Sequence, residues 1–333
     1  MSKEIVVSGV RPTGRQHLGN YFGAVVNFVK MQEIYNGYFF VADYHSLTTH
    51  PKAADLKANV KQIVAEYLAC GLDPNKCTLY LQSDLPQIPE LYLIFNMFAY
   101  KGELEREATF KDKVRDQPDN VNAGLLTYPV LMAVDIIIHK AVKVPVGKDQ
   151  QQHLEMTRDF VKRFNNLYGV EYFPEPQAFN FGNTLVSIPS LDGEGKMSKS
   201  KGEQTCIYLS DEPDAIRKKV MRAVTDSGPT APNSPKPLVI QNIFDLMKLV
   251  SAPETIQHFD EKYNDCTIRY GDLKKQLAED MVKFVSPIGE KIKELTANDK
   301  MLSQIIGDGC QKARVSAAQT IKDVREIIGI KSF

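Results

Sequence analysis

The chain of 333 residues has no tryptophan, only five cysteines and no excess of charge of either sign. Its 41 basic and 41 acidic side chains argue against a protein that wraps nucleic acid along a uniformly basic face, but they leave room for a local basic patch. With 43% hydrophobic and 25% charged residues, the composition excludes a disordered, collagenous or coiled-coil chain. A chain of this length needs neither a disulfide nor a structural metal to be stable.

The cysteines do not form a disulfide or zinc framework, because they are odd in number, scattered and never in a C-x-x-C pair. The longest apolar run, residues 130–138, is too short to span a bilayer and contains Asp135. The first residues lack the apolar core of a signal peptide. These absences predict a soluble cytoplasmic protein with reduced thiols and no membrane contact.

Strand and helix signals alternate along the first part of the chain. Short β-branched or aromatic runs typical of buried strands are separated by apolar residues at helical spacing. The predicted strands cover residues 5–7, 38–42, 78–81, 142–146 and 185–188, and the predicted helices include residues 21–34 and 54–72. This alternation predicts an α/β fold with a Rossmann-like parallel sheet.

Beyond residue 211 the pattern is helical only. The predicted helices are residues 213–223, 239–249, 272–295 and 301–328. Four prolines between residues 229 and 237 predict an exposed connection. We therefore expect two domains: residues 1–205, with the sheet, a helical insertion at about 85–140 and a loop at 192–202, and an all-helical domain at 206–333.

A glycine-bearing turn follows the first predicted strand, with the sequence R-P-T-G-R-Q-H-L-G-N at residues 11–20. Glycines let the backbone approach a ligand closely, and a helix start presents free N–H groups and a positive dipole to an anion. His17 and Asn20 would project to the same side of such a helix. The turn is neither a G-x-G-x-x-G fingerprint nor a P-loop. It predicts a phosphate site, with an ordinary strand-to-helix turn as the alternative.

A second candidate is the lysine-rich loop at residues 192–202, in which Lys196, Lys199 and Lys201 fall within six residues and are flanked by glycines. Lysines on such a loop could close over a polyphosphate and neutralise the charge that develops in a transition state. A solvated loop is the alternative.

A third candidate is one face of the helix predicted after residue 124, which carries Tyr128, Met132, Asp135 and His139. A carboxylate among apolar neighbours requires a hydrogen-bond donor. That donor is either another group of the protein or the single N–H of a flat aromatic ligand such as an indole.

The turn at residues 147–153, G-K-D-Q-Q-Q-H, follows the next predicted strand. Its Asp149 could cap the following helix. Alternatively, Asp149 could bind a ribose hydroxyl and Gln150 an amino group.

The first two motifs together, P-T-G-x-x-H-L-G-N and K-M-S-K-S, resemble the two signatures of class I aminoacyl-tRNA synthetases. Further segments are similar to those of the bacterial-type tryptophanyl-tRNA synthetases: G-E-L-E-R at 102–106, L-M-A-V-D at 131–135, the turn at 147–153 and A-V-T-D-S at 223–227. The resemblance extends from about residue 5 to residue 329.

The resemblance implies a role for each matching residue. The implied catalytic residues are His17, Asn20, Lys111, Lys196 and Lys199. Further contacts to ATP are implied for Arg11, Pro12, Thr13, Gly19, Gly147, Lys148, Asp149, Leu185, Val186, Met197, Ser198 and Ser200. The implied tryptophan pocket consists of Val7, His45, Tyr128, Met132, Asp135 and Gln150. Relatives often carry an aromatic residue in place of Val7 and an acid in place of Lys148.

The implied reaction is attack of the tryptophan carboxylate on the α-phosphorus of ATP, with Mg²⁺ on the phosphates, followed by acyl transfer to the terminal ribose of tRNA(Trp). It needs no protein nucleophile, so positioning and charge stabilisation are the contribution of the enzyme. In the resemblance, Asp135 accepts the indole N–H while Tyr128 and Gln150 hold the amino group. A pocket that hydrogen-bonds a substrate N–H rejects an analogue without it by roughly 10⁴- to 10⁵-fold, so no editing domain is expected.

The C-terminal helices resemble the anticodon-binding region of the family. On the last predicted helix, Lys312, Arg314, Lys322 and Arg325 could meet tRNA phosphates or be merely solvated, and further basic clusters lie at 196–201 and 217–222. Residues 91–100 hold more large apolar side chains than one helix face can bury, which predicts a homodimer.

Three rival functions remain open on the sequence alone: a tyrosyl-specific enzyme, a small-molecule nucleotidyltransferase, and a non-catalytic tRNA-binding relative. The last would have no reason to retain both His17 and Lys196.

Overall fold

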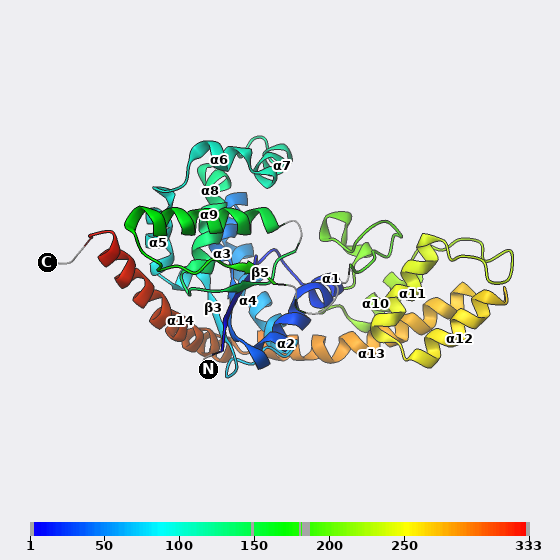
Figure 1. Ribbon diagram of the computed structural model, residues 1–333. Helices are drawn as coiled ribbons and strands as arrows, with labels where there is room; N and C mark the ends of the chain where they lie inside the picture. Colours follow the sequence, from blue (N-terminus) through cyan, green and yellow to red (C-terminus); the bar gives the residue numbers. More distant parts are fainter. Residues whose placement is uncertain (1–2, 148–149, 180, 182–186, 331–333) are drawn as a thin grey trace.

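The computed structural model of the protein describes residues 3–147, 150–179, 181 and 187–330. Four of the expected nucleotide contacts, Lys148, Asp149, Leu185 and Val186, lie outside the described residues. The strand predicted at 185–188 is not confirmed, because its first two residues lie outside the described part and the other two are not in a strand. Figure 1 shows a sheet-containing part surrounded by helices and a helical part beside it, with two long helices running end to end below both.

The sheet has five parallel strands in the order β3-β2-β1-β4-β5. The strands are β1 Ile5–Val10, β2 Asn36–Val41, β3 Thr78–Leu81, β4 Lys143–Val144 and β5 Gln177–Ala178. The expected Rossmann-like α/β fold is therefore confirmed. Because the chain moves outward in opposite directions from β1, a crevice opens at the carboxyl ends of β1 and β4, which is where such sheets bind ligands.

Helices cover the sheet and form the segment expected at about 85–140. They are α1 Leu18–Asn20, a π-helical turn Tyr21–Val25, α2 Val26–Ile34, α3 Asp43–Ser46, α4 Ala53–Ala69, α5 Gln87–Asn96, α6 Lys101–Arg106, α7 Ala108–Asp116, α8 Ala123–Ile137 and α9 Gln151–Tyr168. Short 3₁₀ turns occur at Leu47–Thr49, Gln82–Asp84, Lys199–Lys201 and Glu203–Thr205.

The C-terminal part is helical, as expected. Its helices are α10 Pro213–Met221, α11 Leu238–Val250, α12 Pro253–Asn264, α13 Tyr270–Thr296 and α14 Asp299–Ile327. The sequence did not predict α12, which buries only Phe259 and Tyr263. It also did not predict the two-residue strand β5, whose residues are exposed. None of the described helices is both long and apolar enough to cross a membrane.

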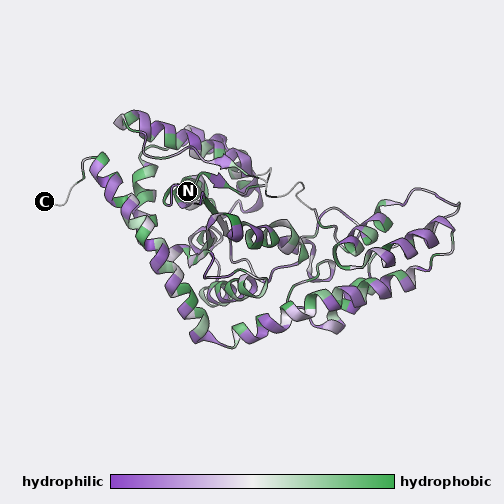
Figure 2. Cartoon of the chain, turned by 60° about the horizontal axis from the view of Figure 1, so that its bottom comes forward, coloured by the Kyte–Doolittle hydropathy of each residue, from purple (hydrophilic) through white to green (hydrophobic). Residues whose placement is uncertain are grey.

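The buried apolar side chains form two clusters. One joins the sheet, α4, α5, α8 and α9 to the inner face of α14, and the other joins α10–α13 to Leu18 and to residues 188–209. Along the C-terminal helix, hydrophobic and hydrophilic residues alternate as on an amphipathic helix packed on one side (Figure 2). A Cβ atom at Gly309 would lie 1.8 Å from the carbonyl oxygen of Leu79, so α14 packs directly on β3.

The division expected near residue 205 does not follow the boundary between these clusters. The last helix belongs to the core of the sheet although it follows the helical part in sequence. The lysine-rich loop, expected in the sheet domain, contributes the buried Met197 to the helical core, together with residues 206–209. The helical core is thus inserted between β5 and α14.

Candidate active site

A cavity of about 370 Å³ lies in the crevice beyond the carboxyl ends of β1 and β4. It is lined by all six residues expected to bind tryptophan: Val7, His45, Tyr128, Met132, Asp135 and Gln150. Arg11 and Gly147, expected at the nucleotide, also line it. The sequence motifs from β1, α8 and the turn after β4 are therefore brought together around one cavity.

Asp135 is the buried anion of this cavity, with 2% of its surface exposed. Its carboxylate accepts hydrogen bonds from Gln82 Nε2 at 2.8 and 2.9 Å and contacts His45 Nε2 at 2.9 Å. Burial raises the pKa of Asp135, while the hydrogen bonds from His45 and Gln82 oppose this rise. The donor required by a buried carboxylate is therefore present within the protein, and Gln82, which the sequence did not indicate, supplies most of it.

Tyr128 belongs to a polar network that lines the same cavity. Its hydroxyl hydrogen-bonds His153 Nε2, and His153 Nδ1 lies 2.8 Å from Gln150 Oε1. Glu107 Oε1 lies 3.2 Å from His153 Nε2. Both Glu107 and His153 are about 1% exposed. The network fixes the side chains of Tyr128 and Gln150, the two residues expected at the amino group.

Two cations face the cavity. Lys113 Nζ lies 3.3 Å from the centre of the Tyr128 ring. Burial and, second, the positive charge of Arg11 lower the pKa of Lys113 to about 8. Burial also lowers the pKa of Arg11. These two cations have lost part of their hydration and also repel each other. A bound anion would offset both the lost hydration and the repulsion, so the pair forms a site for an anion.

Lys111, which the resemblance placed in catalysis, is exposed and does not line the cavity. The reason is the phase of α7. Glu107 caps this helix by accepting hydrogen bonds from the backbone N–H groups of Thr109 and Phe110. That start directs Thr109 and Lys113, four residues apart, into the cavity and turns Lys111 outward.

A second cavity of about 200 Å³ adjoins the first and shares Ser8, Gly9 and residues 145–147 with it. The π-helical turn and α2 line its other side. Gly9 allows the close approach of chains here, because a Cβ atom at this position would lie 2.3 Å from the ring of Phe40. The two cavities together extend along the crevice from α8 to α2.

The turn at residues 11–20 begins at the larger cavity, which Arg11 lines, and leads into the helical residues 23–31, several of which line the smaller cavity. Burial and, second, the charge of Lys199 lower the pKa of His17 to about 4, so its imidazole is neutral at pH 7. The backbone N–H of His17 donates to Asn20 Oδ1 at 3.1 Å. A Cβ atom at Gly19 would lie 2.8 Å from the imidazole, so any larger residue there would have to displace the ring of His17. On the same turn, Pro12 is buried and Thr13 is exposed.

The lysine-rich loop reaches this turn. Lys199 Nζ donates to the carbonyl oxygens of Gly14 at 3.0 Å and Thr13 at 3.4 Å. Met197 is buried, and Ser198 Oγ lies 2.9 Å from Ser200 Oγ. Lys196 is exposed. The structure thus brings Lys199 to the turn of His17 and leaves Lys196 in solvent.

The basic residues considered for tRNA are mostly bound within the chain. Lys312 Nζ and Arg314 Nε donate to the carbonyl oxygens of Pro74 and Asp84. Arg217 pairs with Glu279 and Lys219 with Asp211. These clusters therefore anchor helices as well as carrying charge.

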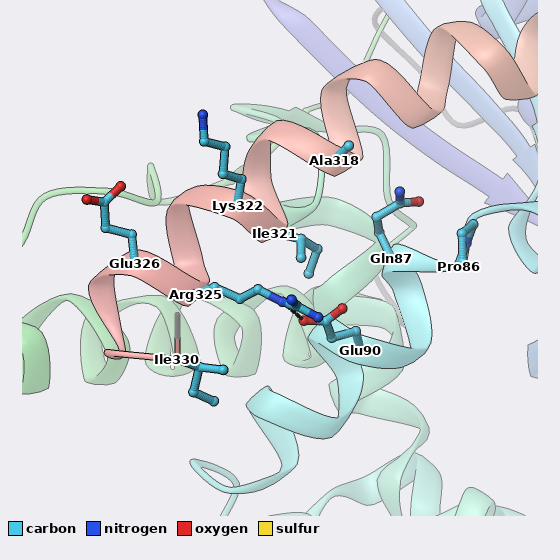
Figure 3. A pocket seen from close by; sticks show the side chains of 9 residues that line it. All are labelled: Pro86, Gln87, Glu90, Ala318, Ile321, Lys322, Arg325, Glu326 and Ile330. Atoms are coloured by element: carbon cyan, nitrogen blue, oxygen red, sulfur yellow. Dashed lines mark hydrogen bonds and ion pairs between the residues drawn. The ribbon is translucent and has the colours of Figure 1, made fainter. Parts of the chain in front are cut away.

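A larger hollow of about 510 Å³ lies elsewhere, between α5 and α14 (Figure 3). In it Arg325 points to Glu90 and pairs with it at 2.5 Å, while Lys322 points away into solvent. None of the expected site residues lines this hollow. It is an open surface groove, remote from the crevice.

Within the described residues, no group of three or more histidine, cysteine or acidic side chains could hold a metal ion.

Comparison with known proteins agrees with this geometry. The family model for class I tRNA synthetases (W and Y) matches residues 2–286. A tryptophan–tRNA ligase of Porphyromonas gingivalis is 57% identical over 98% of this chain and 100% of its own length. One of Fusobacterium nucleatum is 40% identical over 97% of both chains.

Solved structures give the same result. The tryptophanyl-tRNA synthetase of Campylobacter jejuni, complexed with ADP and tryptophan, has a TM-score of 0.87 and 35% identity and covers 98% of this chain and 99% of its own. A tyrosyl-tRNA synthetase from Aeropyrum pernix shares the fold, with a TM-score of 0.64, 18% identity and coverage of 92% and 89%. The chain therefore belongs to the class I tRNA synthetases of the tryptophanyl and tyrosyl group, and within that group to the bacterial tryptophanyl-tRNA synthetases.

Proposed function

We propose that the protein activates L-tryptophan with ATP to tryptophanyl-adenylate and transfers the acyl group to tRNA(Trp), releasing AMP and diphosphate. The observation that carries this proposal is the buried carboxylate of Asp135, which lies in a cavity that Arg11 of the first signature segment also lines. The curated relatives of high identity are tryptophan–tRNA ligases. The tyrosyl-specific alternative is therefore not favoured.

The tryptophan side chain would enter the larger cavity with its indole N–H directed to Asp135. Val7, Met132 and Ile136 supply apolar lining, and His45 and Gln82 hold the carboxylate in its accepting orientation. At the opposite end, Tyr128 and Gln150 would bind the amino group. Because this chain has Val7 on β1, the indole would pack there on an aliphatic side chain.

ATP would occupy the smaller cavity with its adenosine and extend its phosphates towards the turn at residues 11–20. His17, being neutral, would donate an N–H group to a phosphate oxygen, and Asn20 an amide N–H. Arg11 and Lys113 would face the α-phosphate and the tryptophan carboxylate. We assign to Lys113 the assisting role that the resemblance gave to Lys111.

In the adenylation step, an oxygen of the tryptophan carboxylate attacks the α-phosphorus, and the bond to the bridging oxygen of pyrophosphate breaks. Negative charge grows on the leaving pyrophosphate, where Lys199 and, after loop closure, Lys196 would stabilise it. Mg²⁺ would enter with ATP as part of the substrate, bound by its phosphates. Both reactants are held in position, so no covalent enzyme intermediate is required.

The test is ATP–pyrophosphate exchange with tryptophan, with tyrosine and with neither amino acid. Exchange that depends on tryptophan, followed by charging of purified tRNA, is the expected result. Exchange with tyrosine alone would establish the tyrosyl alternative, and exchange without tRNA charging would indicate a nucleotidyltransferase.

We further propose that the helices α10–α13 serve as the anticodon-binding domain and that the protein is a homodimer. The dimer rests on the end of α5 and the residues that follow, where Leu93, Met97 and Tyr100 are 59%, 70% and 60% exposed. Apolar side chains grouped in this way on a surface are typical of protein interfaces. Sedimentation as a monomer would exclude this assignment. A cytoplasmic location is consistent with the five free cysteines.

A further inference from the structure

The strongest unexplained feature near the site is a buried carboxylate that faces no ligand. Glu66 on α4 is 1% exposed. Both of its carboxylate oxygens accept from the backbone N–H of Gln16, each at 3.1 Å, and Gln62 Nε2 donates to Oε1 at 2.8 Å. Glu66 therefore contacts the turn of His17 from behind, one residue before the imidazole.

The same residue of the turn is held on its other side by the helical core. The carbonyl oxygen of Gln16 accepts from the N–H of Leu209 at 2.9 Å, and the N–H of Leu18 donates to the carbonyl of Ile207 at 2.9 Å. His17 and Tyr208 thus face each other in an antiparallel bridge. The backbone on both sides of His17 is fixed by α4 from one core and by residues 207–209 from the other.

Glu66 also acts through charge on the lysine-rich loop. Lys199 lies over the turn, bound to the carbonyls of Gly14 and Thr13, and attraction to Glu66 raises its pKa against the lowering effect of burial. Lys199 and Arg15 are the cations that face Glu66. The carboxylate thus lies where it restrains both signature segments at once.

Keeping this carboxylate buried is unfavourable for the fold. Burial raises the pKa of Glu66 to about 7, because its hydrogen bonds and the two cations only partly offset desolvation. A glutamine would fill the same volume without this penalty. A residue that costs stability at a junction beside catalytic groups indicates a functional role.

We propose that Glu66 is a positioning residue for adenylation, which aligns the turn of His17 through Gln16 and keeps Lys199 over that turn. This proposal rests on the adenylation function proposed above. It assigns Glu66 no contact with substrate. Its effect is on the geometry of His17 and Lys199 when the pyrophosphate leaves.

The principal test is Glu66→Gln in ATP–pyrophosphate exchange. The variant keeps the size of the side chain but loses the charge and one acceptor. We expect kcat to fall roughly 10- to 100-fold, because small misplacements of reacting groups cost up to about 100-fold. The KM for tryptophan should stay within twofold, since the indole cavity is lined by other residues. Asp55→Asn, exposed on the same helix, is the matched control and should retain wild-type kinetics.

A double-mutant cycle separates positioning from a general structural effect. If Glu66 acts through Lys199, Glu66→Gln should lower kcat much less in a Lys199→Ala background than in the wild type. Full additivity of the two losses, or an unchanged kcat in Glu66→Gln with normal thermal unfolding, would overturn the proposal.

Should Glu66→Gln fail to fold, Glu66→Asp decides instead. It keeps the charge but withdraws the carboxylate from the Gln16 N–H, so the same loss of kcat at constant tryptophan KM is expected, and wild-type kinetics would refute the role. Failure of the proposed function itself is distinguishable, because the wild-type protein would then show no tryptophan-dependent exchange.

Discussion

Replacing Asp135 by asparagine tests the proposed indole site most directly. The substitution is nearly isosteric and leaves one carbonyl oxygen, for which Gln82 Nε2 and the indole N–H would compete. In the wild type, the carboxylate offers two oxygens to Gln82, His45 and the ligand. A hydrogen bond to a charged group contributes about 1.5–3 kcal/mol, so the Kd for tryptophan should rise roughly 10- to 150-fold.

The chain itself provides the assay, because it contains no tryptophan and so has no indole emission of its own. Binding is measured from the emission of the ligand, with equilibrium dialysis as the independent method. The KM for ATP should change by no more than about twofold, since Asp135 lines only the cavity assigned to tryptophan.

The control is a change in the ligand rather than the protein. An analogue with sulfur in place of the indole N–H, measured as a competitor, should bind the wild type far more weakly than tryptophan. In Asp135→Asn this difference should largely disappear. If the variant weakens tryptophan and the sulfur analogue by the same factor, the carboxylate acts on the shape of the pocket, and the assigned hydrogen bond is refuted.

Three further outcomes are expected. Lys113→Ala should raise the KM for ATP at least tenfold, while Lys111→Ala leaves it unchanged. In the wild type, kcat/KM for ATP should fall above about pH 8 as Lys113 loses its proton. Equal effects of the two lysine variants in pyrophosphate exchange would reverse the assignment. Lys196→Ala should lower kcat for adenylation far more than tryptophan binding, measured by exchange and by ligand emission, and unchanged exchange would exclude its role. The pKa of the Glu66 carboxyl is raised from 4.5 to about 7, so this group stabilises the fold fully below pH 4.5 and loses that contribution as the pH rises through 7. The free energy of unfolding of Glu66→Gln, measured in urea, should therefore rise relative to that of the wild type between pH 5 and 8, by at most about 3 kcal/mol. A gain in stability that does not depend on pH would contradict the direction of the pKa shift.

The sequence could predict the sheet and the location of the cavity, because both depend on local signals. β-branched or aromatic runs predicted β1 to β4, and the segments that follow β1 and β4 meet at the crevice because carboxyl ends of parallel strands lie at one edge. Even the need of Asp135 for a donor followed from its apolar neighbours. The identity of that donor did not, since Gln82 follows another strand and its pairing depends on the register of the sheet.

The sequence also could not predict which face of the short helix α7 points to the cavity. Lys111 and Lys113 are the same residue type two positions apart, so residue type alone does not distinguish them. The cap formed by Glu107 sets the start of α7 and thereby which of the two lysines faces the cavity. Thr109 and Lys113 are four residues apart and so lie on the same face of the helix, a relation that would have indicated Lys113.

The packing partner of α14 could not be predicted either, because an amphipathic pattern shows that one face is buried but not which core that face joins. One signal was available. Gly309, Ala313 and Ala317 follow one another at four-residue spacing, and small residues in a row permit close approach of another backbone. In the structure, Gly309 touches the backbone of Leu79.

The balance of 41 positive and 41 negative side chains gains a different meaning from this arrangement. Some cations are paired with carboxylates, as Arg217 is with Glu279 and the buried Lys219 with Asp211, while Arg11 and Lys113 repel each other in the crevice. A polyphosphate or carboxylate would therefore be attracted to the crevice more than to the surface, although the net charge is zero. Attraction to Glu107 offsets part of the repulsion felt by Lys113, and a bound anion would offset more of it. For the same reason, binding of ATP should stabilise the fold, in contrast to the buried charge of Glu66, which no ligand neutralises.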